Sequence, residues 1–209
     1  MEAGRRARVG CRLVTSRATI LLTIALALTG CASDQQKISA INAVNEGFRV
    51  EYEKLLAEKG ARVYRLSRVD AFVSMRVALA ELGMKTEQQD LSLGHLGVAA
   101  KAPLPLTDDE WRRASDVDLP LLRRLIEPHV GAAASFVQFE PQGLEVVINA
   151  TFLEVPGGTE VSLTVRLREI APPRSGWPRR EYVSPRVLAL GIEKIFGTFE
   201  REVRAGPQR

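Results

Sequence analysis

The fold is decided by residues 144–170, LEVVINATFLEVPGGTEVSLTVRLREI. Two β-rich runs, Leu144 to Val155 and Glu160 to Ile170, flank the turn sequence Pro156-Gly157-Gly158. In the second run apolar and polar residues alternate, which is typical of a strand with one buried and one solvated face: Val161, Leu163, Val165 and Leu167 alternate with Ser162, Thr164, Arg166 and Arg168. A third run, Ser135 to Glu140, precedes another turn sequence. We therefore expect a three-stranded antiparallel meander with one buried face.

The C-terminal region predicts a helix that covers this face. Ser184 is the expected N-cap and Pro185 the first helical residue, and the helix should end before Gly206. Its apolar stripe has spacings of four, three, four and four: Leu188, Ile192, Ile195, Phe199 and Val203. We expect Ile195 and Phe199 to pack on the apolar face of the sheet.

The residues before the meander predict a strand, a helix and a second strand. Residues 61–67 favour a short strand, and Asp70 is the expected N-cap of a helix that ends at Gly83. The stripe of this helix consists of Phe72, Met75, Leu79 and Leu82. Residues 91–100, which contain two glycines, predict a strand with a bulge or twist.

Residues 107–130 predict a helical insertion. Thr107 and Glu110 form a capping box, and a second short helix is expected from Asp118, with Pro120 in its first turn. The acidic residues of this region are Asp108, Asp109, Glu110, Asp116 and Asp118. Helix caps and first-turn positions explain them better than a metal site does, because nothing in the sequence brings their oxygens together. We predict neither a metal nor another cofactor.

Residues 38–60 predict an amphipathic helix that packs on the domain. Its apolar positions span about two heptads, too few for a coiled coil: Ile41, Val44, Phe48, Tyr52 and Leu55. The predicted fold is therefore a single α+β domain over residues 61–204, preceded by this helix. It consists of an antiparallel sheet with helices packed on one face, a helix-grip-like sandwich.

Residues 1–30 have the three parts of a secretory signal peptide: five arginines, an apolar stretch too short to remain as a membrane span, and small residues. The end of this leader, Leu28-Thr29-Gly30-Cys31, resembles the lipobox of bacterial lipoproteins. The resemblance implies cleavage before Cys31, a thioether-linked diacylglycerol on its sulfur, and an acyl chain such as palmitate on its amino group. The alternative is an ordinary cleaved signal followed by a chance cysteine.

Residues 31–37 are small and polar and predict a flexible lipidated tether. The residue after Cys31 is Ala32, whereas lipoproteins kept in the inner membrane usually have aspartate there. The resemblance thus implies the periplasmic face of the outer membrane, with the periplasmic face of the inner membrane as the alternative.

Loss of the leader makes the chain neutral and leaves it without a thiol pair. The chain has 29 basic and 25 acidic residues, and residues 1–30 contain five of the basic and one of the acidic residues. The mature 179 residues therefore keep 24 basic and 24 acidic residues. A neutral periplasmic domain is a poor match for nucleic acid. Cys11 is removed with the leader and Cys31 carries lipid, so we expect no disulfide.

The sequence contains no catalytic motif. His95 and His129 stand without a nucleophile elbow or a zinc-binding helix, and we interpret them as surface or capping residues. The loop around Trp177 has an aromatic and arginine composition that interfaces favour, and it is our candidate interface: Arg174, Trp177, Arg179 and Arg180.

Residues 61–203 resemble a group of small uncharacterised proteobacterial lipoproteins in the order of their predicted elements. More remotely, the layout is similar to the helix-grip domains of the lipoprotein C subunit of the outer-membrane β-barrel assembly machinery. The resemblance implies architecture and no site residues. We expect a non-enzymatic binding or scaffolding component of the outer membrane with an envelope protein as partner. The alternative is a carrier of lipid or another hydrophobic ligand, and an enzyme ranks third.

The lipobox interpretation predicts the behaviour of Cys31→Ser. Both diacylglycerol transfer and cleavage by the lipoprotein peptidase require the thiol, so this variant should take up no labelled fatty acid and should remain an uncleaved precursor. Metabolic labelling and the size of the product on a gel test this. Normal maturation of the variant, with retention in the membrane, would contradict the interpretation.

Overall fold

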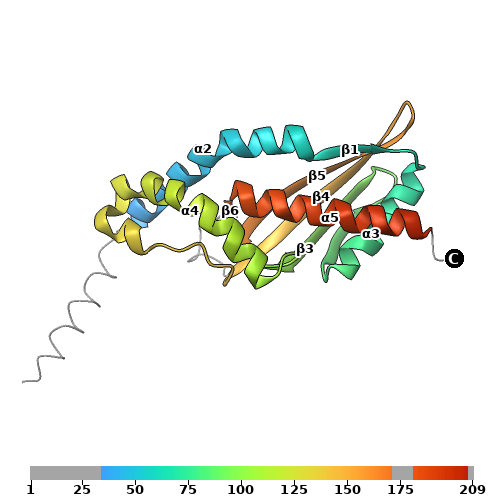
Figure 1. The fold of residues 1–209 in the computed structure, drawn as a ribbon. Coiled ribbons are helices and arrows are strands. Elements are labelled where there is room, and N and C mark those ends of the chain that lie inside the picture. Colours follow the sequence, from blue (N-terminus) through green and yellow to red (C-terminus); the bar gives the residue numbers. More distant parts are fainter. Residues whose placement is uncertain (1–33, 171–180, 207–209) are drawn as a thin grey trace, which may run out of the picture.

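The centre of the sheet is the hairpin that the sequence predicts, formed by β4 (Leu144–Val155) and β5 (Gly158–Glu169). The computed structural model describes residues 34–170 and 181–206 (Figure 1). The other elements in chain order are α2 (Asp34–Lys59), β1 (Ala61–Tyr64), α3 (Arg68–Glu81), β2 (Lys85–Asp90), β3 (His95–Lys101), α4 (Asp108–Val130), the 3-10 helix η1 (Gly131–Phe136), β6 (Glu181–Tyr182) and α5 (Pro185–Ala205). None of the helices within these ranges is apolar over a length that would cross a membrane.

All strand pairs are antiparallel, in the order β1-β5-β4-β3-β2, and β6 pairs with β5 beyond the end of β1. β4 and β5 pair along their whole length, from Leu144 opposite Glu169 to Val155 opposite Gly158. A Cβ atom on Gly158 would lie 1.9 Å from the carbonyl oxygen of Tyr64, so only glycine allows β1 to approach the turn this closely.

One face of the sheet is apolar and the helices cover it. Its β5 side chains are at most 2 % exposed: Val161, Leu163, Val165 and Leu167. Ile195 and Phe199 of α5 are fully buried in the same cluster, as predicted. All four α-helices of the described residues contribute side chains to this cluster, through Leu55, Phe72, Trp111 and Phe199, among others. Figure 1 shows α5 crossing the strands on this side. The predicted α+β class with an antiparallel sheet is confirmed.

The opposite face of the sheet is polar. Thr164 and Arg166 of β5 are exposed, and Arg168 forms an ion pair with Glu145 of β4, with a nitrogen–oxygen distance of 2.7 Å. The alternation along β5 therefore separates a dry face from a wet one, as a half-buried strand requires.

The predicted strand at Ser135 to Glu140 is wrong. Residues 131–136 form η1, and residues 137–143 pair with no strand. Side chains take carbonyl groups that a strand would have used: Arg123 donates to the oxygen of Val137, and the Trp111 indole donates to that of Phe139. The third strand of the meander is β3, which pairs with β4 from the other side.

The prediction for residues 91–100 is also corrected. The strand β3 begins at His95, residues 91–94 form a turn, and the sequence prediction missed β2 before it. β2 is an edge strand with the sequence KTEQQD, exposed at five of its six positions. Because neither of its faces is buried, it carries no apolar alternation to indicate a strand.

Several predicted helix boundaries shift. Ser67, and not Asp70, is the N-cap of α3, and its hydroxyl accepts a bond from the Asp70 N–H. The two short helices predicted in residues 107–130 are one helix, α4, with Pro120 inside it. Proline has no N–H, so Pro120 costs α4 one backbone hydrogen bond. Burial of the apolar side chains of α4 offsets this loss. The helix predicted at 38–60 begins at Asp34, so residues 34–37 of the predicted tether are helical, while 31–33 lie outside the described residues.

The contact between α5 and the sheet predicts a large difference between two substitutions on the same helix. Phe199→Ala removes a fully buried ring and should lower the free energy of unfolding by about 3–5 kcal/mol. Arg201 makes an exposed ion pair with Glu81, so Arg201→Ala should cost less than about 1 kcal/mol. Thermal and urea unfolding of the two variants measure this, and equal losses would contradict the packing described.

Candidate binding groove

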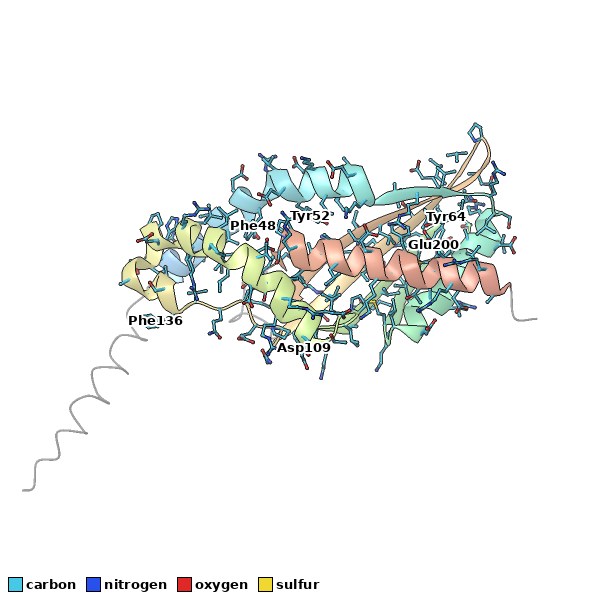
Figure 2. The ribbon with its side chains drawn as sticks, in the orientation of Figure 1. Phe48, Tyr52, Tyr64, Asp109, Phe136 and Glu200 are labelled. Carbon is cyan, nitrogen blue, oxygen red and sulfur yellow. The ribbon has the colours of Figure 1, made fainter. Side chains whose placement is uncertain are left out.

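A second apolar cluster joins α2 and α4 at one end of the molecule. Phe48 of α2 is 1 % exposed and lies between the two helices (Figure 2). Its members on α2 and on α4 are four residues apart, so each stripe covers the other, and Ala134 of η1 completes the cluster. The members on the two helices are Ala40, Val44, Phe48, Leu122 and Ile126. A Cβ atom on Gly47 would lie 2.5 Å from a methyl carbon of Leu125, so glycine lets this side chain rest on the backbone of α2.

The start of α4 is held by its predicted capping box. The Thr107 N–H donates to the Glu110 carboxylate, and the Glu110 N–H donates to the Thr107 hydroxyl, at 2.7 and 3.2 Å. Glu110 also forms an ion pair with Lys194 of α5, at 2.6 Å. These bonds from Lys194 and from the Thr107 N–H lower the pKa of Glu110.

An open apolar groove of about 410 Å³ lies beside the second cluster. Its walls come from α2, α4 and the extended segment that leads from η1 to β4. The lining residues are Ala40, Ile41, Val44, Leu122, Ile126, Val130, Val137, Gln138, Phe139, Glu140, Gln142, Leu144 and Tyr182. This volume is within the range of small-ligand sites.

Trp111 holds the extended segment that forms one wall of the groove. The ring of Phe139 stacks on Trp111, with ring centres 5.6 Å apart and an angle of 10° between the planes. The Trp111 indole N–H donates to the Phe139 carbonyl oxygen at 2.9 Å. Trp111 is 2 % exposed, so the wall rests on the main core and keeps the groove open.

Asp118 connects α4 to the start of α5. Ser184 is the N-cap residue, as predicted, but its hydroxyl does not cap the helix; it donates to the Asp118 carboxylate at 2.7 Å. The Arg186 N–H donates to the same oxygen at 3.0 Å, so Asp118 supplies the cap from another helix. Burial raises the pKa of Asp118, and these two bonds offset part of the increase.

A second hollow, of about 470 Å³, lies further along α2 and is more polar. Tyr52 lines it and donates its hydroxyl to the Val165 carbonyl oxygen at 2.7 Å. Burial raises the pKa of Tyr52. Asn45 donates to the Glu181 carbonyl oxygen at 2.8 Å. These bonds attach α2 to the edge of β5 between β1 and β6, beside this hollow.

The far end of the molecule carries a charged network between β1 and α5. Arg62 pairs with Glu193 and Glu200, each at 2.9 Å, and its guanidinium lies 4.3 Å from the ring centre of Phe196. Tyr64 donates to Glu200 at 3.0 Å, and burial together with this carboxylate raises the pKa of Tyr64 (Figure 2). All of these groups have partners, and the network holds β1 to the helix.

The hollow found between the sheet and α5 is small. The hollow beneath α5 at residues 103–106 holds only about 10 Å³, close to the minimum for one water molecule. An acyl chain does not fit there. Two larger hollows among the described residues are the α2–α4 groove and the one lined by Asn45, Arg49 and Tyr52.

Most of the predicted functional residues lie outside the described ranges: Cys31, Arg174, Trp177, Arg179 and Arg180. His95 is half-buried at the start of β3, and His129 lies in the last turn of α4. Residues 34–170 and 181–206 contain no group of three or more histidine, cysteine, aspartate or glutamate side chains arranged to hold a metal ion.

Sequence reasoning missed the groove. The apolar positions of residues 38–60 predicted one buried stripe, now seen on α2, but nothing in them indicated that α4 would cover it. Comparisons of the chain with protein-family models, with curated proteins and with solved structures found no match. The resemblance to proteobacterial lipoproteins stays a prediction.

The buried position of Asp118 predicts a pH-dependent difference between the natural chain and Asp118→Asn. The folded-state pKa is above the ordinary value of 3.8, so the folded protein retains this proton to a higher pH than the unfolded chain does. The contribution of Asp118 to stability therefore falls as the pH rises from 3.8 through the folded-state pKa. Because asparagine does not titrate, the stability of the variant relative to the natural chain should rise over the same interval.

Urea unfolding at a series of pH values measures this difference. Asp116→Asn, at an exposed position two residues away, is the matched control and should change the free energy of unfolding by less than about 0.5 kcal/mol. A difference between Asp118→Asn and the natural chain that stays constant across the series would contradict the prediction.

Proposed function

We propose that the protein is a lipid-anchored, non-enzymatic binding component of the periplasmic face of the outer membrane, whose α2–α4 groove binds an apolar segment of an envelope protein. The observation that carries this proposal is the open apolar groove of about 410 Å³. Covering its apolar lining removes that surface from water, which favours binding by roughly 25 cal/mol per Å². The lipobox resemblance at Cys31 supports the anchor.

The shape and chemistry of the groove favour a polypeptide as its occupant. Two of its walls are helices, α2 and α4, and grooves of this kind receive apolar side chains of a partner helix or peptide. One rim carries three exposed polar side chains that can bond to the backbone or polar side chains of a bound segment: Gln138, Glu140 and Gln142.

Crosslinking in living cells tests the proposal. A photoreactive amino acid is placed in the groove at Ile41 or at Val130, both half-buried, and in the control at Val73, which is 39 % exposed on α3. We expect both groove positions to capture the same envelope protein and Val73 not to capture it. Mass spectrometry of the adducts identifies the captured partner.

A charge in the groove should abolish this capture. With the photoreactive residue at Val130, Ile41→Glu should lower the yield of the adduct at least about ten-fold, because a carboxylate in an apolar contact loses its hydration. Val73→Glu is the matched control and should leave the yield unchanged. The proposal fails if the two groove positions share no partner, or if Ile41→Glu and Val73→Glu have equal effects.

A second candidate is a carrier of lipid, favoured by the apolar character of the lining. Native mass spectrometry of the mature protein decides between the two. A co-purifying lipid that is lost in Ile41→Glu and kept in Val73→Glu would support the carrier, and phospholipid adducts at both groove positions would agree with it.

A further inference from the structure

Phe136 is the most exposed large apolar residue of the described chain, at 86 %. It ends η1, whose sequence Gly131-Ala-Ala-Ala-Ser-Phe136 contains no charged side chain. Five of these six residues are exposed, and the buried one, Ala134, attaches η1 to the second apolar cluster. The structure thus presents an uncharged corner with an aromatic ring at its tip. We refer to Gly131–Phe136 as the η1 corner.

The η1 corner lies at the end of the molecule where α2 begins. Ala134 shares its cluster with Ala40, which is six residues after the start of α2, and Figure 2 shows Phe136 at this end, with Tyr64 and Glu200 at the other. A chain extends at most about 3.6 Å per residue, so the step from Cys31 to Asp34 spans no more than about 11 Å. A lipid on Cys31 would hold this end of the domain at the bilayer.

We propose that the η1 corner contacts the periplasmic leaflet of the membrane beside the lipid anchor, with Phe136 inserted at the level of the headgroups. This inference rests on the lipid anchor of the proposed function. Aromatic rings favour the boundary between headgroups and acyl chains, and the small residues of η1 allow the backbone to approach that boundary without burying a charge.

The contact would also set the orientation of the groove. Val130 precedes η1 and Val137 follows it, and both line the groove. With the η1 corner on the bilayer, the groove lies at the membrane surface. The partner that this orientation favours exposes its apolar segment next to the bilayer.

Leu93 provides a matched control, because it is 78 % exposed but lies far from the anchor. It precedes Gly94, whose Cβ position is 2.4 Å from the Phe152 carbonyl oxygen. Phe152 is eight residues along β4 from Leu144, a residue of the groove, and eight residues of strand span about 26 Å.

The experiment uses the lipidated mature protein in vesicles of phosphatidylethanolamine and phosphatidylglycerol. Since lipid occupies Cys31, a cysteine introduced at Ala133 or Leu93 is the only thiol and accepts an environment-sensitive fluorophore. Quenching by lipids with a spin label near the headgroup should be at least about two-fold stronger at position 133 than at 93. Adding Phe136→Ser should reduce quenching at 133 to the level at 93. The circular dichroism and melting temperature should not change, because Phe136 is exposed.

Co-sedimentation with the vesicles separates failure of this inference from failure of the anchor. If the protein does not sediment with the vesicles, both the anchor and this inference are wrong. If it sediments but positions 133 and 93 are quenched equally, the anchor stands and the proposed contact is overturned. Stronger quenching at 133 that persists in Phe136→Ser would overturn the role assigned to Phe136.

Discussion

The structure depends on the burial of one face of the β4–β5 hairpin beneath α5. Leu163 and Val165 on the strand, and Ile195 and Phe199 on the helix, are at most 2 % exposed and lie in one cluster. Neither surface is stable in water alone, because each exposes a continuous apolar stripe. The other helices add to this core from the same side, and the opposite face of the sheet is left polar.

The second cluster, between α2 and α4, relies on the first for its position. Trp111 belongs to the main core and holds the wall of the groove through Phe139. Asp118 binds the first turn of α5, and Glu110 pairs with Lys194 of the same helix. These contacts fix α4 against α5. The groove is thus a consequence of how α4 is attached to the central core.

The arrangement connects the proposed anchor with the proposed binding site. The first turns of α2, the groove and the η1 corner all lie at one end of the molecule, and the charged network around Arg62 lies at the other end. Such polarity suits a protein held at a surface, because ligand and membrane approach the same end. Close packing beneath α5 makes the central core rigid, and the end with the groove is attached to this core.

The sequence by itself determined the elements whose burial leaves a periodic pattern. The alternation of β5 and the stripe of α5 predicted both elements and the contact between them, and the capping box predicted the start of α4. It did not determine β2, which is exposed and lacks alternation, or the course of residues 135–140, whose carbonyl groups Arg123 and Trp111 take. It also did not pair α2 with α4. Tertiary structure decided these features, because they depend on which surfaces meet in space. The apolar stripe of one helix does not indicate which surface will cover it.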